Sequence, residues 1–428
     1  MRGAPRWLPA VVLSFGLLPC ACGGKGPEQG VTLTLYHWME KDRTMWEEEI
    51  IKPFEAAHPG IHVVLQTAPY ALYVSKSFTS IASGSHFADV MYAEDWFGQE
   101  LIRKEYALNL MPYVRRDIAT NDFSTETFTE WRGVGQRDDE LYGFPACIGL
   151  TVLFYNKDLF DRAGLPYPDT TWTYDDLIRA GERLTVRRDG SPVQWGLCFD
   201  IHYTGLETVI YSFGGRTLTD DARSAALTDP ATLRALHYIQ DLFVTHRIAS
   251  STTSFVNPFE QFIARRAAMI LVGSLGAINL DGTTMRWDMT YPPKGPDGMR
   301  RSRRFTLAYL IPRNSPHPAE AWELVRWIMT KTPAALIDRQ YQGMLPTYKP
   351  VASSPAWLDA QPLYSRRLLV ELERGQSFPL FTPGWQEWRD NNLTPEMMSM
   401  VRGEKSVEAS AASAQERINA VLARVYAP

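Results

Sequence analysis

The folded part of the chain begins with an alternation of strand and helix patterns. Residues 31–36 alternate apolar and polar side chains as a strand does, residues 43–57 follow a helical pattern, and residues 61–65 form a second strand pattern. A helical pattern over 72–83 and an apolar run over 88–92 extend the series. A strand, a helix and a strand in this order make a βαβ unit, whose strands pair in parallel. The alternation therefore predicts an α/β fold in which helices flank parallel-rich sheets.

Helix-start and helix-stop signals continue this order through the middle of the chain. Asn156 can cap a short helix that ends at Gly164, and Thr173 with Asp176 forms a capping-box pattern before a second helix. The apolar run over 267–272 has the pattern of a buried strand. These signals predict that the α/β organisation extends well beyond the first unit.

Composition and charge exclude several classes of protein. The 428 residues are 45% hydrophobic and 21% charged, which is typical of a folded protein with substantial cores. The 44 basic and 48 acidic residues form no long block, so the sequence lacks the electrostatic footprint of a nucleic-acid-binding protein. We therefore expect no nucleic acid among its partners.

Enzyme and metal-site motifs are missing from the sequence. Asp138, Asp139 and Glu140 are adjacent, so their side chains would point in different directions, as in a solvated turn. The eight His are scattered, and the sequence has neither a His-Glu-x-x-His nor a Cys-x-x-Cys pattern. We expect no catalytic residue, no metal and no cofactor.

The N-terminus has the order of a secretory signal peptide. Arg2 and Arg6 precede an apolar run over 7–18, and small residues follow around Cys22. The segment Leu18–Gly24 resembles a bacterial lipobox, in which a cysteine receives a lipid after cleavage. Cys22 is the expected lipidation site, so the mature protein is expected outside the cytoplasm, anchored to the cell membrane.

This interpretation divides the N-terminal region into two segments. Residues 1–22 are expected to be the lipoprotein signal peptide, and the Gly-rich residues 23–30 a flexible tether. Pro19 stands where a lipobox usually has leucine, so ordinary cleavage with free secretion stays open as the alternative.

Two further cysteines belong to the body of the chain. Cys147 and Cys198 remain once Cys22 is set aside, and an oxidising compartment permits them to form a disulfide. The sequence leaves both the paired and the free state open.

Four segments in a fixed order resemble one protein family. They are Leu141–Pro145, Leu153–Phe160, Ala163–Leu165 and Thr171–Thr173. This series is similar to that of the extracellular solute-binding proteins of carbohydrate ABC transporters, family 1, which include the maltose-binding proteins. Weaker matches in the same order extend the resemblance over nearly the whole mature chain.

The resemblance implies the clamshell fold of type II periplasmic binding proteins. In that fold a ligand cleft lies between two α/β lobes. The resemblance places lobe 1 at residues 31–143 plus 290–344, and lobe 2 at residues 147–287 plus 345–428.

It also implies ligand-binding residues in the first lobe. Trp38, Glu40 and Lys41 follow the first strand and correspond to ligand-contacting positions of maltose-type members; a solvated loop is the alternative. Asp95 and Trp96 follow the third strand, where the family commonly places a hydroxyl-binding carboxylate beside an aromatic ring. Open α/β sheets bind ligands at such strand ends. Aromatic faces and planar polar groups suit the C–H faces and hydroxyls of a sugar.

Further aromatic candidates come from later in the chain. Tyr203, Trp385 and Trp388 stand in regions that bear stacking aromatics in relatives, although either tryptophan can instead be core. Many relatives carry a stacking tryptophan where this chain has Leu275, and Tyr309 is the residue that would compensate for its loss.

One basic cluster stands out in the sequence. It consists of Arg300, Arg301, Arg303 and Arg304, and we interpret it as a solvated hairpin. Docking to a transporter or to an anionic surface is the alternative.

Together these features predict a function. The resemblance implies high-affinity extracytoplasmic binding of a sugar or oligosaccharide by a monomer, and delivery of this small-molecule carbohydrate to the permease subunits of an ABC importer in the membrane. The alternatives are an importer protein for glycerol-phosphate or a polyol, a secreted carbohydrate-active enzyme, and a sensor that delivers its closed form to a signalling partner.

Overall fold

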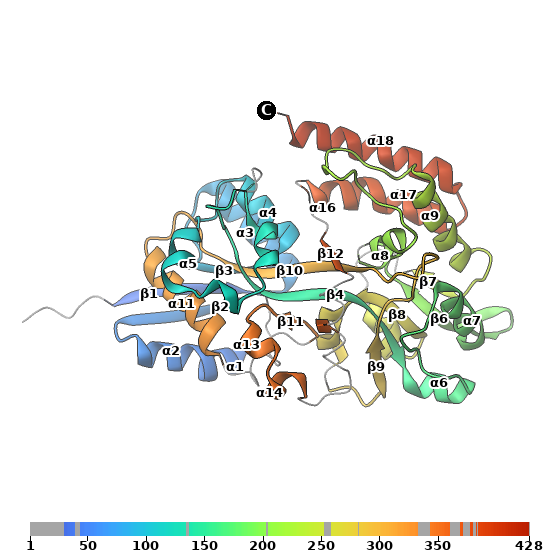
Figure 1. Cartoon of the computed structure of the whole chain (residues 1–428), viewed down its shortest axis with the longest axis horizontal. Coiled ribbons are helices and arrows are strands. Elements are labelled where there is room, and N and C mark those ends of the chain that lie inside the picture. Colours follow the sequence, from blue (N-terminus) through green and yellow to red (C-terminus); the bar gives the residue numbers. More distant parts are fainter. Residues whose placement is uncertain are drawn as a thin grey trace, which may run out of the picture.

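The computed structural model shows two α/β lobes joined by long strands (Figure 1). Cys22, Glu40, Lys41 and Tyr203 lie outside the residues that it describes. The described residues are 30–38, 43–133, 137–202, 204–251, 258–280, 282–332, 343–359, 369–370, 377–379, 382 and 384–427.

Twelve strands of the described chain join in one mixed sheet. Its path runs through β2 (Ile61–Thr67), β1 (Val31–His37), β3 (Val90–Glu94), β10 (Ser302–Leu310), β4 (Phe144–Asn156), β8 (Ala267–Gly273), β6 (Ser191–Phe199) and β5 (Val186–Arg188), and β7 (Ala249–Ser251), β9 (Trp287–Thr290), β11 (Leu345–Pro346) and β12 (Ser377–Pro379) pair beside it. In the first lobe β1 pairs in parallel with β2 and β3, and in the second β6 pairs in parallel with β7 and β8.

The strand β4 belongs to both lobes. Its residues 144–150 pair antiparallel with β10, and its residues 151–155 pair antiparallel with β8. All 13 residues of β4 are buried, as expected for an apolar strand that has neighbours on both sides and covered faces. The sheet therefore passes from one lobe to the other through β4, and Figure 1 shows β10 running beside it.

Helices flank this sheet in both lobes (Figure 1). The first lobe carries α1 (Arg43–Met45), η1 (Trp46–Ile51), α2 (Lys52–Ala57), α3 (Tyr70–Ser83), α4 (Asp95–Arg103), α5 (Met111–Asp117), η2 (Thr120–Asp122), η3 (Thr125–Trp131) and α11 (Pro318–Lys331), and α13 (Lys349–Ala352) and α14 (Pro355–Leu358) lie near it. The second lobe carries α6 (Lys157–Ala163), α7 (Tyr174–Leu184), α8 (Thr204–Ser212), α9 (Pro230–Phe243), α10 (Pro258–Ile263), η4 (Ser274–Leu280), α16 (Trp385–Trp388), η5 (Arg389–Leu393), α17 (Thr394–Val401) and α18 (Val407–Val425).

The expected helix signals in the middle of the chain are confirmed. The Asn156 side chain accepts a hydrogen bond from the backbone N–H of Leu159, and α6 ends at Gly164 in the left-handed conformation. Thr173 and Asp176 form a reciprocal capping box at the start of α7. The α/β fold class predicted from the strand and helix order is confirmed as well.

Cys147 and Cys198 do not form a disulfide: both are free and buried. Cys198 on β6 pairs with Ile270 on β8, which pairs with Phe154 on β4. Phe154 lies about seven residues along the extended strand β4 from Cys147. At about 3.3 Å per residue, the two thiols are roughly 20 Å apart or more. A disulfide needs Cα atoms within about 7 Å, so the open alternative of a pair is wrong for this fold.

The segment after β11 packs against the first lobe. The backbone N–H of Ser124 donates to the carbonyl of Thr347 at 2.9 Å, and the Thr347 hydroxyl donates to the carbonyl of Pro145 at 2.6 Å. The rings of Phe123 and Tyr348 are 5.0 Å apart. The predicted lobe bounds stay a prediction, and these contacts favour a boundary later than residue 344.

Candidate functional site

A buried guanidinium group lies where the two lobes meet. Arg303 on β10 is fully buried, and its Nε lies 2.7 Å from Oε2 of Glu207 on α8. Its Nη2 lies 3.9 Å from Oδ2 of Asp95 on α4. Because α4 belongs to the first lobe and α8 to the second, one cation joins carboxylates from both lobes.

This arrangement corrects the interpretation of the basic cluster. Arg303 is 0% exposed and Arg304 is 9% exposed, so neither belongs to a solvated hairpin. They stand on β10, where successive side chains point to opposite faces. Arg304 therefore turns away from Arg303 and pairs with the buried Glu130, with Nη2 2.6 Å from Oε1. Only Arg300 and Arg301 are partly exposed.

Asp95 occupies the first position of α4, directly after β3 ends at Glu94. Its Oδ1 accepts a hydrogen bond of 2.7 Å from the backbone N–H of Trp96. Its Oδ2 is buried and has no hydrogen-bond donor among the described residues. Asp95 thus stands at the carboxyl end of a strand, with one oxygen held by the helix backbone and the other facing Arg303.

Burial controls the ionisation of both carboxyl groups that flank Arg303. It raises the pKa of Asp95 from 3.8 to about 7, although the Arg303 guanidinium lowers it. It also raises the pKa of Glu207 from 4.5 to about 7, against the opposing effects of Arg303 and Arg389. Removing a carboxylate from water disfavours its charged form, and one guanidinium does not offset this for two acids.

Two tryptophans from different lobes meet beside this cluster. The ring centroids of Trp96 on α4 and Trp385 on α16 are 5.9 Å apart. The Arg303 guanidinium lies 5.8 Å from the Trp385 centroid, and that of Arg389 lies 3.9 Å from it. Trp388 is fully buried and meets the edge of Trp385 at 6.3 Å. Trp385 is therefore the one of the two that reaches the first lobe.

A second aromatic group extends from Trp38. The ring of Trp38 lies 5.3 Å from Tyr70 and 6.1 Å from Tyr92, and Tyr92 in turn lies 4.9 Å from Tyr309. Glu94 Oε2 accepts hydrogen bonds of 2.7 Å from the Tyr70 hydroxyl and from Nε1 of Trp96. Glu94 therefore links this group to Trp96.

Tyr309 does not stand beside the Arg303 cluster. It lies on β10 at the Tyr92 end, fully buried, and six residues of strand separate it from Arg303, which is about 20 Å. The aromatic ring that lies against Gly273, just before Leu275, belongs to Phe305: a Cβ added to Gly273 would come within 3.0 Å of it. Phe305 is also 5.8 Å from the Arg303 guanidinium.

Sequence reasoning missed Glu207, Phe305 and Arg389, and it assigned Arg303 to a solvated hairpin. The signal for Arg303 and Phe305 was strand alternation, which puts both on one face of β10. Glu207 is a single acid in a helix whose other residues are almost all buried, and an acid in such a setting signals a buried partner.

Cavities also open on the surface of the described residues. One of about 360 Å³ lies between the lobes, and the backbone N–H of Gly384 there donates to Oε1 of Glu100 on α4 at 2.8 Å. Its lining residues are Phe78, Glu100, Arg103, Lys104, Gly384, Gln386, Glu387, Arg424 and Val425.

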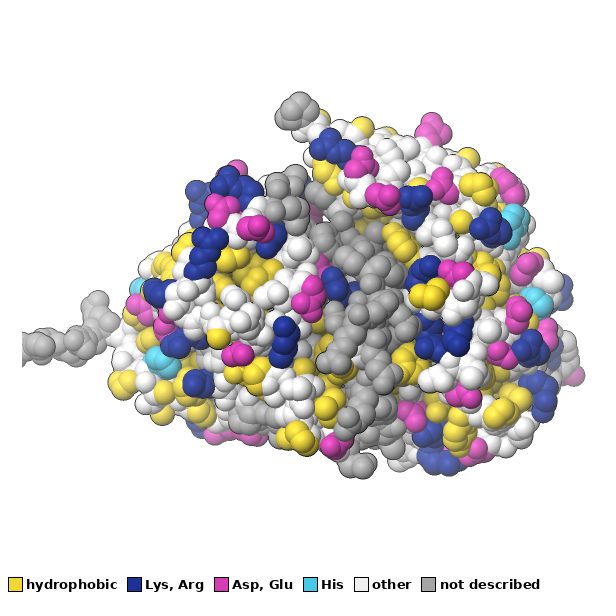
Figure 2. Space-filling model, viewed as in Figure 1, with side chains coloured by type: hydrophobic (Ala, Val, Ile, Leu, Met, Phe, Trp, Pro, Cys, Tyr) yellow, Lys and Arg dark blue, Asp and Glu magenta, His cyan; other side chains and the backbone are white. Residues whose placement is uncertain are grey.

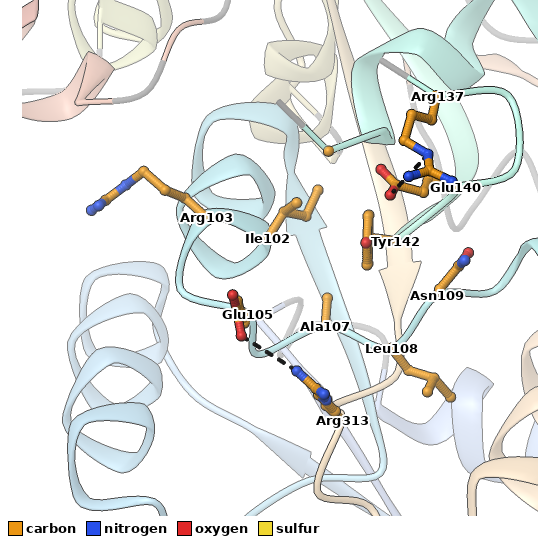
Figure 3. A pocket seen from close by; sticks show the side chains of 11 residues that line it. Ile102, Arg103, Glu105, Ala107, Leu108, Asn109, Arg137, Glu140, Tyr142 and Arg313 are labelled. Carbon is orange, nitrogen blue, oxygen red and sulfur yellow. Dashed lines mark hydrogen bonds and ion pairs between the residues drawn. The ribbon is translucent and has the colours of Figure 1, made fainter. Parts of the chain in front are cut away.

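Another cavity, of about 720 Å³, lies in the first lobe (Figure 3). Arg313 and Glu105 pair across it at 3.5 Å, and Arg137 and Glu140 pair at 3.7 Å. Both ion pairs are thus formed between residues of the first lobe. Over both lobes, basic and acidic side chains are interspersed on the face that Figure 2 shows.

Fold and site define the class of the protein: a two-lobed α/β binding protein with carboxylates and aromatic rings from both lobes at their junction. Residues 40–335 match the family of bacterial extracellular solute-binding proteins, and the chain belongs to this family. Members of that family are binding proteins that act outside the cytoplasm. No helix among the described residues has the length and apolar character needed to cross a membrane.

Similar proteins cover nearly the whole chain. A binding protein of Brucella abortus is 23% identical over 97% of this chain and 98% of its own. An ABC substrate-binding protein of Listeria monocytogenes in complex with cycloalternan has a TM-score of 0.81 at 21% identity, covering 92% of this chain and 99% of that one. UgpB of Mycobacterium tuberculosis in complex with glycerophosphocholine has a TM-score of 0.78 at 16% identity, covering 94% and 99%. These likenesses establish the type II two-lobed fold.

Proposed function

We propose that the protein binds a sugar or oligosaccharide between its lobes and delivers it to the permease of an ABC importer. The observation that carries this proposal is the meeting of Trp96 and Trp385 from opposite lobes beside the carboxyl group of Asp95. Aromatic faces stack on the C–H faces of a sugar, and a carboxylate oxygen accepts hydrogen bonds from its hydroxyls. The likeness to the cycloalternan-binding protein of Listeria monocytogenes supports the same ligand class.

The mechanism of the proposal is lobe closure around the ligand. A ligand that touches Asp95 and Trp96 on one lobe and Glu207 and Trp385 on the other binds the closed form better than the open form. It therefore shifts the population towards the closed form, which the permease recognises. Glu40, Lys41 and Tyr203 remain candidates for additional ligand contacts.

Anchoring is a further part of the proposal. A lipid on Cys22, with residues 23–30 as a tether, would hold the protein near its permease and raise the effective concentration without a new contact. Mass spectrometry of the protein from a bacterial membrane fraction tests this: a diacylated Cys22 is expected, and an unmodified mature N-terminus would contradict it.

The proposal is tested by calorimetry with a panel of ligands. The panel holds maltose, maltotriose, lactose, arabinotriose and erythritol, together with sn-glycerol 3-phosphate and glycerophosphocholine. At least one saccharide is expected to bind and to reduce the radius of gyration in X-ray scattering. If no member of the panel binds or compacts the protein, the proposed function is wrong.

A second candidate is an importer protein for phosphorylated polyols. The buried Arg303 and the likeness to UgpB favour it, since a guanidinium is a good partner for a phosphate. The same panel separates the two candidates, because tight binding of glycerophosphocholine without binding of any saccharide would select the second.

A further inference from the structure

Among the described residues, carboxylates outnumber guanidinium groups where the lobes meet. Arg303 has Glu207 at 2.7 Å and Asp95 at 3.9 Å, so two acids share one buried cation. Arg389 also acts on Glu207, but its guanidinium is held by Asp390, with contacts of 2.7 and 3.1 Å. Neither cation is thus in excess at this junction.

The neighbouring charges do not reverse this balance. Glu94 lies next to Asp95 and adds a further acid, and it accepts hydrogen bonds from Tyr70 and Trp96. Glu130 and Arg304 form a matched pair on β10's other face. Glu130 also raises the pKa of Asp95, so the acids around Arg303 outnumber the cations among the described residues as well.

The junction holds a buried carboxylate oxygen that lacks a hydrogen-bond donor among the described residues. Oδ2 of Asp95 is 0% exposed and has no hydrogen-bond donor among the described residues. A buried acceptor without a donor is costly, so a hydroxyl or other neutral donor brought by a ligand would relieve that cost. A phosphate would bring more negative oxygens to a place that already holds two acids, and would meet repulsion in a poorly hydrated setting.

We infer that Asp95 and Glu207 are specificity-determining residues that restrict this site to uncharged, hydroxyl-bearing ligands and exclude phosphorylated ones. The inference rests on the proposed function and narrows it. Arg303 does not recognise an anion here: its charge is matched by Glu207 and Asp95, and it serves to hold both carboxylates in place. The inference therefore argues against the second candidate function, the import of phosphorylated polyols.

The test is a change in ligand preference when one carboxylate is neutralised. Glu207→Gln keeps the shape of the side chain but removes one of the two negative charges beside Arg303. Affinities for the best neutral saccharide of the panel, for sn-glycerol 3-phosphate and for glycerophosphocholine are measured at pH 8 on the full mature chain. The wild type is expected to bind the phosphates roughly a hundredfold more weakly than the saccharide, and Glu207→Gln to narrow that ratio by about tenfold.

A matched variant controls for loss of a charge elsewhere. Glu404→Gln removes an exposed acid of the second lobe that pairs with Arg402 at 2.7 Å, and it is expected to keep the wild-type ratio. Asp95→Asn gives an independent measurement from the other lobe and replaces Glu207→Gln if that variant does not fold, as judged by its melting temperature.

The outcomes separate this inference from the proposed function. Equal or tighter binding of a phosphate by the wild type overturns the inference, as does an equal loss of affinity for both ligand types in Glu207→Gln, which would mark a purely structural role. Binding of no saccharide by the wild type overturns the proposed function itself, whatever the variants do.

Discussion

At the scale of single residues, the unusual feature is a fully buried arginine between two acids. A buried ion pair is not a strong source of stability, because desolvation of both charges offsets much of their attraction. Removing one partner is costly, however, since it leaves the other charge buried and unmatched. Arg303 is thus more important to Asp95 and Glu207 than to the overall stability of the fold.

The first prediction concerns the removal of this cation. Arg303→Met is expected to lower the free energy of unfolding by about 3 kcal/mol at pH 8, where Asp95 and Glu207 would be left buried and charged. The loss should be smaller at pH 5, because the two acids can then take up protons. Urea denaturation at both pH values measures it. Arg313→Met removes an exposed arginine paired at 3.5 Å and should change stability by less than about 1 kcal/mol; an equal loss in both variants would contradict the argument.

The second prediction concerns the pH dependence of stability. The pKa values of Asp95 and Glu207 are raised to about 7 in the folded protein, so the folded state binds more protons than the unfolded state between about pH 4 and pH 7. Their contribution to stability is therefore fully present below pH 4 and is lost as the pH rises through 7. The double variant Asp95→Asn, Glu207→Gln should gain stability relative to the wild type as the pH increases over this range. A difference that stays constant from pH 4 to pH 8 would show that the two pKa values are not raised.

At the scale of elements, α4 contacts the second lobe at two points. Trp96 near its start meets Trp385, and Glu100 accepts a hydrogen bond from the backbone N–H of Gly384, just before α16. Glu100 and Gly384 also line the 360 Å³ cavity that opens between the lobes. They stabilise the arrangement in which the lobes are together and would be lost if the lobes moved apart.

The third prediction follows from the second of these contacts. A hydrogen bond contributes a net amount of about 0.5–1.5 kcal/mol, so Glu100→Ala should weaken the closed form and raise the Kd for a bound saccharide about two- to tenfold. Calorimetry with the saccharide found in the panel provides the measurement. Glu47→Ala, which removes an exposed acid of the same lobe, should leave the Kd as it is. Unchanged affinity in Glu100→Ala would mean that the contact is also kept in the open form.

Local elements could be predicted from the sequence, and their partners could not. The caps at Asn156 and Thr173 depend on residues three positions apart, so the sequence pattern contains all of the information. The neighbours of Arg303 come from α4 and α8, which only the folded sheet brings together, and a run of arginines around a serine looked like a surface turn. The sequence likewise could not show which of Trp385 and Trp388 reaches the other lobe, because only the fold brings Trp385 against Trp96.

At the scale of the whole molecule, the lobes share strands rather than a flexible linker. β4 pairs with β10 in its first half and with β8 and β9 in its second half. Each lobe also keeps one of the two remaining cysteines in its core: Cys147 lies beside β10, and Cys198 lies on β6. The two-lobed shape is therefore held by backbone pairing and apolar packing, without a covalent bridge between these thiols.

The fourth prediction tests that description. In the mature chain a thiol reagent should label neither Cys147 nor Cys198 under native conditions, because both are buried and burial raises the pKa of each thiol to about 12. In denaturant without a reductant both should react. Peptide mapping of the labelled sites gives the answer, and a failure to label either cysteine in denaturant would indicate a disulfide after all.

The place of β10 in the sheet also affects how the protein is made. In the sheet, β10 lies between β3 and β4, although it comes from much later in the sequence than either. The sheet of the first lobe therefore lacks this strand until residues 302–310 have been synthesised. Pairings between such distant segments form slowly, because the long intervening loop must close first. The early part of the chain therefore stays incomplete during translation. Since members of this family act outside the cytoplasm, a chain that stays incompletely folded until β10 has been made has more time to cross the membrane before it folds.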